Sequence, residues 1–352
     1  MIQRLKIENF RNHIKTDISF DKITVLIGSN GSGKSNILEA VGMISFCRSF
    51  RNENAKNLIK YDQDFCKINS DHLEVILSKT PRLSLRAKEN GAVRKLSDFI
   101  GIIPSVIFSP ETLSIVTGSP GERRRFLDLL ICQFDKDYLS CLIDYERIRK
   151  QRNFLLQRIF ERLSEESELL FWDEKLIENA QKIYSKRNES VDFFNQFLSE
   201  VYAKIAGDPA SQLFVRYEPK VNLLELLHNN RRREIAAGKT LFGPHRDDFS
   251  FILNNVELAN FASRGEIRSA VMALKVAEIA FLKEQRKKSY RNTEPVLLLD
   301  DIFSEFDKER REHLGEIIQQ YQTIITTTES EHLSSDLIRK AKIIKVKNGK
   351  IE

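Results

Sequence analysis

The sequence predicts an α/β fold in which the two ends of the chain build one buried sheet and a helical region is inserted between them. Two short apolar runs, Ile23–Ile27 and Pro295–Leu299, are typical of central strands. From Pro120 to about Ala206, by contrast, apolar residues recur at helical spacing among many charges. We therefore expect three parts, residues 1–119, a mainly helical insertion over 120–239, and residues 240–352.

The composition is that of an ordinary globular protein. Hydrophobic residues make up 41% and charged residues 30% of 352 residues, and the mean hydropathy is −0.36, which argues against disordered, collagen-like and membrane classes. No run approaches the roughly 18 apolar residues of a spanning helix. The formal net charge of +6 mildly favours a polyanionic partner such as nucleic acid.

The start of the chain and its cysteines point to a cytoplasmic location. Charged residues already interrupt Met1–Lys6, so we expect no secretory signal. The four cysteines contain no C-x-x-C pair, and the six histidines contain no H-E-x-x-H motif. A disulfide framework or structural zinc site is therefore not expected, and a reducing cytosol is the default compartment.

The remaining elements follow from local patterns. Alternation predicts a strand near the N-terminus, and short alternating runs between Phe65 and Leu96, with a turn at Glu89–Gly91, predict hairpins. The middle is long enough for two or three antiparallel helices, but it lacks the sustained heptads of a long coiled coil. Further strands are expected at Leu213–Val215, Phe249–Leu253, Thr323–Thr326 and Ile343–Val346, and further helices at 37–44, 223–235, 264–286 and 309–321.

A phosphate-binding motif occupies the turn after the first buried strand. The pattern G-x-x-x-x-G-K-[ST] is matched at every fixed position by Gly28, Ser29, Asn30, Gly31, Ser32, Gly33, Lys34 and Ser35. The glycines let backbone N–H groups point at a phosphate, and the helix start adds positive potential. We therefore expect the loop to bind a nucleotide such as ATP, with Lys34 at the β- and γ-phosphates and Ser35 on Mg²⁺.

Two acids follow the second buried strand. Asp300 and Asp301 come directly after Leu297–Leu299, where an acidic residue at a strand end completes the Mg²⁺ site of a phosphate-binding loop. We expect Asp300 to lie beside Mg²⁺, through a water molecule, and Asp301 to orient or deprotonate the attacking water. Together with Lys34, Asp301 is the catalytic candidate.

A second candidate phosphate-binding element opens a later helix. Ser263, Arg264 and Gly265 stand at the predicted helix start, where backbone N–H groups can bind an anion. Two such helix ends seldom meet one nucleotide within a subunit, but across a two-fold dimer the second can close over the γ-phosphate. A simple N-cap at Ser263 is the alternative.

Further motifs stand in a fixed order along the chain. They are Ile7–Asn12, Asn36–Ala40, Ser109–Glu111, Gly118–Pro120, Arg123–Asp128, Gly243–Asp248 and Leu299–Asp307. Together with the loop, these motifs resemble the RecF family of bacterial DNA-repair proteins, over nearly the whole chain. The resemblance implies an ABC-type P-loop ATPase head related to structural-maintenance-of-chromosomes proteins, with a mixed sheet, flanking helices, β-hairpins and an inserted α-helical subdomain.

The resemblance also implies roles for particular residues. Ser263, Arg264 and Gly265 match the signature loop, and Ser304–Asp307 matches the D-loop that lines the dimer seam. Glu266 stands where the family usually has Gln, which affects the side-chain contact at this position but not the backbone contact of Gly265.

An activity follows from the same resemblance. The family closes as an ATP-dependent homodimer, grips DNA in the closed form and releases it after slow hydrolysis, so a weak DNA-dependent ATPase is expected. It acts with RecR and RecO to direct RecA onto gaps coated by single-strand-binding protein. Recombinational repair and the SOS response are its context.

Three basic clusters are candidates for contact with DNA phosphates. No acid interrupts residues 147–160, and the insertion as a whole has nearly equal numbers of basic and acidic residues. Each cluster is also explained as a solvated helix face. The clusters are Arg147, Arg149, Lys150, Arg152 and Arg158; Arg123–Arg125; and Arg231–Arg233.

Three other functions remain open at this point. A transport ATPase subunit coupled to a membrane partner would share the loop, although it would carry His after the Thr323–Thr326 strand, where this chain has Thr327. A small-molecule kinase would have no use for Ser263–Glu266. A DNA-binding module that uses ATP only to hold a dimer together would keep dimerisation and DNA binding in Asp301→Asn.

Overall fold

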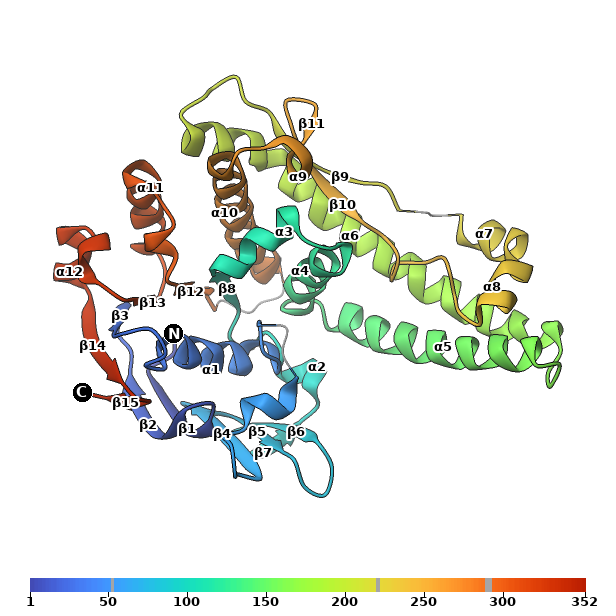
Figure 1. Cartoon of the computed structure of the whole chain (residues 1–352), viewed down its shortest axis with the longest axis horizontal. Coiled ribbons are helices and arrows are strands. Elements are labelled where there is room, and N and C mark those ends of the chain that lie inside the picture. Colours follow the sequence, from blue (N-terminus) through green and yellow to red (C-terminus); the bar gives the residue numbers. More distant parts are fainter. Residues whose placement is uncertain (52–53, 220–221, 289–292) are drawn as a thin grey trace.

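The two ends of the chain share one central sheet, as the buried apolar runs predict. The computed structural model describes residues 1–51, 54–219, 222–288 and 293–352. The central sheet has six strands in the order β15-β14-β3-β13-β12-β8 (Figure 1). Neighbouring strands in it pair in parallel, except β14 and β15, which are antiparallel. The strands are β3 (Ile23–Ile27), β8 (Ser105–Phe108), β12 (Val296–Asp300), β13 (Thr323–Thr327), β14 (Lys342–Lys347) and β15 (Lys350–Ile351).

Both faces of this sheet are covered, which explains why its inner strands are apolar along their whole length. Leu298 packs in the hydrophobic cluster that contains α1 (Lys34–Phe46), whereas Leu297 and Leu299 pack in the cluster that contains α10 (Arg264–Lys288). Because successive side chains point to opposite faces, a slip of one residue would exchange the two sets. Burial on both sides therefore fixes the register.

A second six-stranded sheet is antiparallel and lies on the other side of α1, in the order β2-β1-β4-β5-β6-β7. Its last hairpin turns at Asn90 and Gly91, whose φ angles of 51° and 79° are those that a two-residue hairpin turn requires. The predicted hairpins are therefore confirmed. The strands are β1 (Arg4–Phe10), β2 (His13–Ser19), β4 (Phe65–Ser70), β5 (Leu73–Ser78), β6 (Ser84–Glu89) and β7 (Ala92–Arg94).

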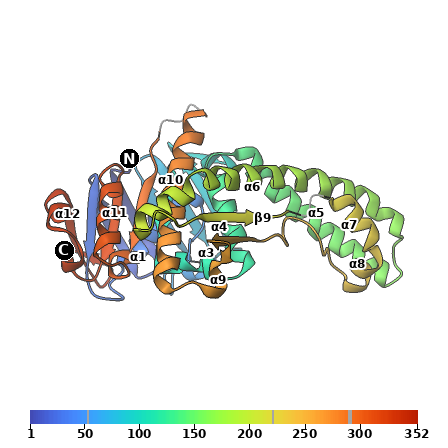
Figure 2. The same ribbon diagram turned by 90° about the horizontal axis from the view of Figure 1, so that it is seen from above.

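The helical middle of the chain projects as a long arm (Figures 1 and 2). Its base is α4 (Pro120–Cys132), and its shaft is the pair α5 (Lys136–Phe160) and α6 (Leu169–Ala206), which pack against each other. Although α6 is 38 residues long, no helix in the described ranges has both the length and the apolar character needed to cross a membrane.

A small third sheet, in the order β11-β10-β9, lies beside the arm and connects it to the last third of the chain. Its strands are β9 (Leu213–Tyr217), β10 (Phe249–Leu253) and β11 (Val256–Glu257). The remaining helices are α2 (Leu96–Phe99), α3 (Ser114–Thr117), α7 (Leu223–Asn229), α8 (Arg231–Ala237), α9 (Leu258–Phe261), α11 (Lys308–Ile318) and α12 (Ser335–Lys340). Single 3-10 turns are η1 (Ala55–Leu58), η2 (Pro110–Leu113), η3 (Glu166–Glu168), η4 (Ile302–Ser304) and η5 (Ser330–His332).

One predicted helix differs from the structure. The helix expected over 223–235 is divided at Asn230 into α7 and α8. The Asn230 side chain donates a hydrogen bond to the Leu226 carbonyl oxygen at 2.9 Å. Such a local bond from an asparagine side chain competes with the helical backbone pattern, which explains the break.

Candidate nucleotide site

The loop between β3 and α1 has a shape that only glycine permits at two positions. Gly33 has a φ of 111°, and a Cβ there would lie 2.8 Å from side-chain atoms of Asn12 and His13. A Cβ at Gly28 would lie 2.2 Å from the Val346 carbonyl oxygen. The motif glycines are thus required by left-handed backbone and by close neighbours, as a phosphate-binding turn demands.

Segments from both ends of the chain brace this loop. His13 Nε2 donates to the Gly33 carbonyl oxygen at 3.0 Å, and the Gly349 amide donates to the Ser32 carbonyl oxygen at 2.8 Å. Because a carbonyl oxygen only accepts, His13 carries its proton on Nε2. Burial lowers the pKa of His13 and so favours the neutral ring. The loop is therefore held in position by contacts that its own motif does not contain.

Among the described residues, Lys34 of the loop forms no ion pair, and the Ser32 hydroxyl has no hydrogen-bond partner. Lys34 Nζ donates to the carbonyl oxygens of Gly28 at 2.7 Å and Ser29 at 3.0 Å. Burial lowers the pKa of Lys34, and the nearby carboxylates Asp301 and Asp300 oppose that shift. Ser32 Oγ is buried and has no hydrogen-bond partner among the described residues. The loop thus presents a cation and an unsatisfied polar group, as a phosphate site would.

The two acids lie at the same edge of the sheet as the loop. In the parallel register, Leu26 of β3 and Asp300 of β12 both pair with Thr326 of β13, so the carboxyl ends of these strands meet. Asp300 is buried, and its Oδ1 accepts a hydrogen bond from Thr326 Oγ1 at 2.7 Å. Asp301 follows with a left-handed φ of 52°, and its amide donates to Thr326 Oγ1 at 3.0 Å.

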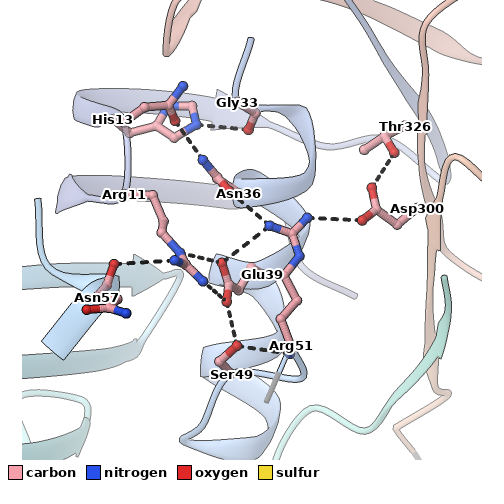
Figure 3. Close-up of polar contacts among 11 residues, drawn as sticks. Arg11, His13, Gly33, Asn36, Glu39, Ser49, Arg51, Asn57, Asp300 and Thr326 are labelled. Atoms are coloured by element: carbon pink, nitrogen blue, oxygen red, sulfur yellow. Dashed lines mark hydrogen bonds and ion pairs between the residues drawn. The ribbon is translucent and has the colours of Figure 1, made fainter. Parts of the chain in front are cut away.

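An arginine that the sequence analysis did not single out completes this cluster (Figure 3). Arg51 donates from Nη2 to Asp300 Oδ2 at 3.1 Å and from Nη1 to Asn36 Oδ1 at 3.2 Å. Its Nη1 also lies 3.9 Å from Glu39 Oε2. Arg51 therefore connects the acid of β12 to the first two turns of α1.

Glu39 is the buried anion of this network. Arg11 binds it with two nitrogens, Nε to Oε2 at 2.8 Å and Nη2 to Oε1 at 2.7 Å, and Ser49 Oγ donates to Oε1 at 2.5 Å (Figure 3). Glu39 is fully buried, so its charge depends on these partners. The Arg11–Glu39 pair ties the turn after β1 to α1 and so supports the phosphate-binding loop.

The second predicted phosphate-binding element is a helix start on a separate part of the molecule. Figure 1 shows the beginning of α10 beside α9, well away from the junction of β3 and α1. Ser263 Oγ accepts from the Glu266 amide at 3.2 Å, and Glu266 Oε2 accepts from the Ser263 amide at 2.7 Å, which is a reciprocal capping box. Both residues are exposed or half-buried. Glu266 is thus used in the cap.

Arginines connect this helix start to the segment expected to be the D-loop. Arg310 Nη2 donates to the Gly265 carbonyl oxygen at 3.3 Å and to Ser269 Oγ at 2.8 Å. Arg268 Nη2 lies 2.5 Å from Glu305 Oε2. The residues from 263 to 269 and from 304 to 310 therefore form one connected surface.

The three basic clusters have different environments. Arg152 is fully buried between Asp173 and Glu234, at 2.7 and 2.5 Å, so it stabilises the arm and does not face solvent. Arg123 is likewise buried and binds Asp248 with two nitrogens, Nε and Nη2. The exposed members of the clusters are Arg147, Lys150, Arg158, Arg232 and Arg233.

The residues of the Gly243–Asp248 motif also make internal contacts that hold the fold together. Arg187 of α6 donates from Nη1 to the Pro244 carbonyl oxygen at 2.8 Å, and Tyr217 Oη donates to Asp247 Oδ2 at 2.7 Å. Tyr145 Oη lies 2.7 Å from His245 Nδ1. These contacts fasten the motif to α5, α6 and β9.

The fold and this site together define an ABC-type P-loop ATPase head. A phosphate-binding loop joins a central parallel strand to α1, two acids end a strand of the same sheet, and a helical arm is inserted. The chain belongs to the family described as RecF/RecN/SMC N terminal domain, whose model matches residues 1–352.

Curated relatives and solved structures place the chain within the RecF branch. It is 35% identical over 369 residues to the "DNA replication and repair protein RecF" of Agathobacter rectalis, covering 100% of this chain and 99% of the relative. The RecF protein of Halalkalibacterium halodurans is 34% identical over 375 residues, covering 100% and 99%. The chain is thus a member of the RecF family of DNA replication and repair proteins.

Solved structures agree in fold. The structure of "the recombination mediator protein RecF-ATP in RecFOR pathway" superposes with a TM-score of 0.90 at 28% identity, covering 100% of this chain and 96% of that one. A Smc head domain from Pyrococcus furiosus matches with a TM-score of 0.54 at 17% identity, covering 100% and 95%, which shows a shared fold alone. The expectation of an ABC-type head is confirmed.

Proposed function

We propose that this chain is an ATP-dependent DNA-binding protein of recombinational repair, in which two copies close around ATP and grip DNA at gaps or junctions. One observation carries the proposal: the loop over residues 28–35 and the start of α10, which Ser263 caps, are two candidate phosphate-binding elements on separate parts of one chain. In a two-fold dimer, each copy offers its α10 start to the loop of the other, which creates two composite sites.

The loop residues fit ATP and Mg²⁺. Lys34 would hold the β- and γ-phosphates in place of the carbonyl oxygens that it now contacts, and Ser32 Oγ would gain a polar partner. Ser35 and Asp300 would hold Mg²⁺, and Asp301 would orient or deprotonate the attacking water. ATP with Mg²⁺ supplies the phosphoryl group that is transferred to water.

The partner copy would contribute the start of α10. Ser263, Arg264 and Gly265 would face the γ-phosphate across the dimer seam, with Ser304–Asp307 beside them. The contacts of Arg310 with Gly265 and of Arg268 with Glu305 support this role, because they hold both segments in one surface. The capping box orders the first turn of α10 in advance, so little conformational entropy is lost when the copies meet.

Within this assembly we propose that residues 1–119 and 240–352 form the head and that 120–239 is an inserted subdomain. DNA is the proposed cargo, and RecR and RecO are the proposed protein partners. The relatives' description as DNA replication and repair proteins, and a solved relative's place in the RecFOR pathway, support this context. A cytoplasmic location agrees with it.

Sedimentation velocity tests the proposal. Three cells would contain the protein alone, with Mg²⁺ and ATP, and with Mg²⁺, ATP and a gapped DNA duplex. We expect a monomer in the first cell, a dimer in the second and a dimer–DNA complex in the third. Ser263→Arg, which places a bulky cation at the seam, should remain monomeric with ATP. A wild-type protein that stays monomeric at micromolar concentration with ATP would contradict the proposal.

A further inference from the structure

A small pocket that the proposed reaction does not use lies between the base of the arm and α10. It has a volume of about 200 Å³, and its wall is formed by residues 46–51 at and after the end of α1, by residues between 107 and 115, by α4 and by α10. Figures 1 and 2 show α3 and α4 beside α10 in this region. Neither Lys34 nor Asp300 lines the pocket, so it is distinct from the nucleotide site.

Most of the wall is apolar, and three phenylalanines contribute to it. Phe46 and Phe126 are buried, and Phe50 is half-buried. Aromatic rings offer flat surfaces against which a planar molecule packs closely. A cavity of roughly 150 Å³ is enough to hold benzene, so this pocket has room for a planar molecule of one or two rings. The other apolar residues of the wall are Ile107, Ile115 and Leu129.

A buried ion pair of α10 also lines the pocket. Lys275 Nζ donates to Glu278 Oε2 at 2.8 Å, and both side chains are more than nine-tenths buried. Oε1 of Glu278 has no hydrogen-bond partner in the part of the chain that the structure describes. Burial raises the pKa of Glu278, and Lys275 opposes that shift. Because a buried oxygen without a partner is costly, a hydrogen-bond donor on a ligand would stabilise this arrangement.

Donors stand beside this acceptor. The ammonium group of Lys275 has three N–H groups, of which one binds Glu278, and Nζ lies 5.0 Å from the centroid of the Phe126 ring. Arg51 Nε is buried and also has no hydrogen-bond partner among the described residues. The apolar wall of the pocket therefore contains an acceptor next to a donor, with a second donor from Arg51.

The charges around the pocket are balanced. Three cations and three acids line it, so the wall has no net formal charge. Burial without a compensating charge disfavours an anionic or cationic ligand, so the balance favours a neutral one. The charged residues are Arg51, Arg125, Lys275, Glu111, Glu122 and Glu278.

We propose that this pocket binds a neutral, planar heterocycle whose edge presents a hydrogen-bond donor beside an acceptor, as a purine or pteridine base with a cyclic amide does. The ring N–H would donate to Glu278, the neighbouring carbonyl oxygen would accept from Lys275, and the ring faces would pack against the phenylalanines. Arg51 lines the pocket and also binds Asp300, so a bound heterocycle lies one residue away from the nucleotide site. Neither DNA nor a second copy of the chain is needed for this binding.

Saturation-transfer NMR and calorimetry on the full-length protein test the assignment, with 9-methylhypoxanthine as the probe. This compound presents a ring N–H beside a carbonyl oxygen, whereas 9-methylpurine has the same two rings without either group. We expect 9-methylhypoxanthine to bind at least about tenfold more tightly, because 9-methylpurine leaves the polar groups of the pocket unpaired. Mg²⁺ with ATP should not displace the probe. Equal affinity for the two compounds, no binding of either, or displacement by ATP would overturn the assignment.

Glu278→Gln tests the location of the probe. It keeps the size of the side chain but removes the carboxylate, so probe binding should weaken at least about tenfold. Glu284→Gln is the matched control and should keep the wild-type affinity, because Glu284 is an exposed acid of the same helix, is paired with Lys288 and lies outside the pocket. Phe50→Leu, which removes a flat ring from the wall, should also weaken binding and serves if Glu278→Gln does not fold. Wild-type affinity in the folded variants would overturn the location.

Inosine distinguishes a free base from one attached to a sugar, since it carries the hypoxanthine ring on a ribose. Inosine that binds as tightly as 9-methylhypoxanthine would show that the pocket accepts the base of a nucleoside. Inosine that binds more weakly would show that it takes the free base. Either result supports a site for the heterocycle and identifies which form of it the pocket takes.

Discussion

Arg51 Nη2 lies 3.1 Å from Asp300 Oδ2, although the two residues are 249 positions apart. Asp300 Oδ1 accepts a hydrogen bond from Thr326 Oγ1, so Arg51 binds the second carboxylate oxygen, Oδ2. Arg51 also contacts Asn36 and Glu39, on the helix that follows the phosphate-binding loop. The acid that we propose for Mg²⁺ is therefore bound by a protein cation in this structure.

Arg51 and Mg²⁺ should compete for Asp300. We expect Arg51→Gln to lower the Mg²⁺ concentration that half-saturates ATP binding about fivefold, the equivalent of roughly 1 kcal/mol for a partly exposed ion pair. Calorimetric titration of ATP at a series of Mg²⁺ concentrations measures this. Arg48→Gln, a nearby exposed arginine, serves as the control and should change nothing. An unchanged or higher Mg²⁺ requirement in Arg51→Gln would refute the competition.

Arg11 should matter more for stability than Arg4, although both lie at or beside β1. Arg11→Ala leaves the fully buried Glu39 without its bidentate partner, so we expect the free energy of unfolding to fall by about 3 kcal/mol. Arg4 pairs with Asp17 on the surface, where solvent screens the ion pair, so Arg4→Ala should cost much less stability than Arg11→Ala. Urea unfolding compares the two, and equal losses would show that Glu39 does not depend on Arg11.

His245 should make the protein less stable in mild acid. Burial lowers the pKa of His245 to about 4, below its usual value of about 6.5, so the unfolded chain takes up a proton before the folded one does. Stability is therefore lost as the pH falls from about 6.5 to about 4, by about 2 kcal/mol at pH 5. Urea unfolding at pH 7.5 and 5 should show this loss in the wild type and a smaller one in His245→Gln. Identical losses would mean that other groups are responsible.

Substitutions at Asp301 and at Lys34 should affect ATP hydrolysis and ATP binding differently. Asp301→Asn keeps the loop and its lysine, so ATP-dependent dimerisation and DNA binding should persist while turnover falls at least about 100-fold. Lys34→Ala should lose ATP binding and, as a result, dimerisation, DNA binding and turnover. Turnover assays and sedimentation distinguish the variants. Hydrolysis at the parental rate in Asp301→Asn would show that its assigned role is wrong.

The parts that the sequence predicted well depend on local patterns. The turn at Asn90–Gly91 and the apolar strands at Ile23–Ile27 and Val296–Asp300 were found because neighbouring residues alone determine them. The phosphate-binding loop also lies where its motif requires, between a buried strand and a helix. The fixed spacing of the glycines, lysine and serine in this motif is enough to predict the shape of the loop.

The parts that the sequence could not predict depend on distant partners. Arg51 has no periodic or motif signal, because its contact with Asp300 exists only once the sheet is assembled. Arg152 stands in a basic, acid-free stretch, so the sequence makes it a candidate for DNA contact. In the structure it is buried and pairs with Asp173 and Glu234, which lie on two other helices. A run of like charges in sequence therefore did not identify the surface on which those charges lie.

Mixing two inactive variants tests most directly whether each ATP is shared by two copies. Lys34→Ala disables the loop of its own copy, and Ser263→Arg disables the element offered to the other. In their mixed dimer, one of the two composite sites is intact. Because neither variant is expected to dimerise with itself, an equimolar mixture should recover up to about half of wild-type ATP turnover. Lys34→Ala mixed with Asp301→Asn should recover none, because both changes affect the loop side of the site. No recovery in the first mixture, or equal recovery in both, would contradict the shared site.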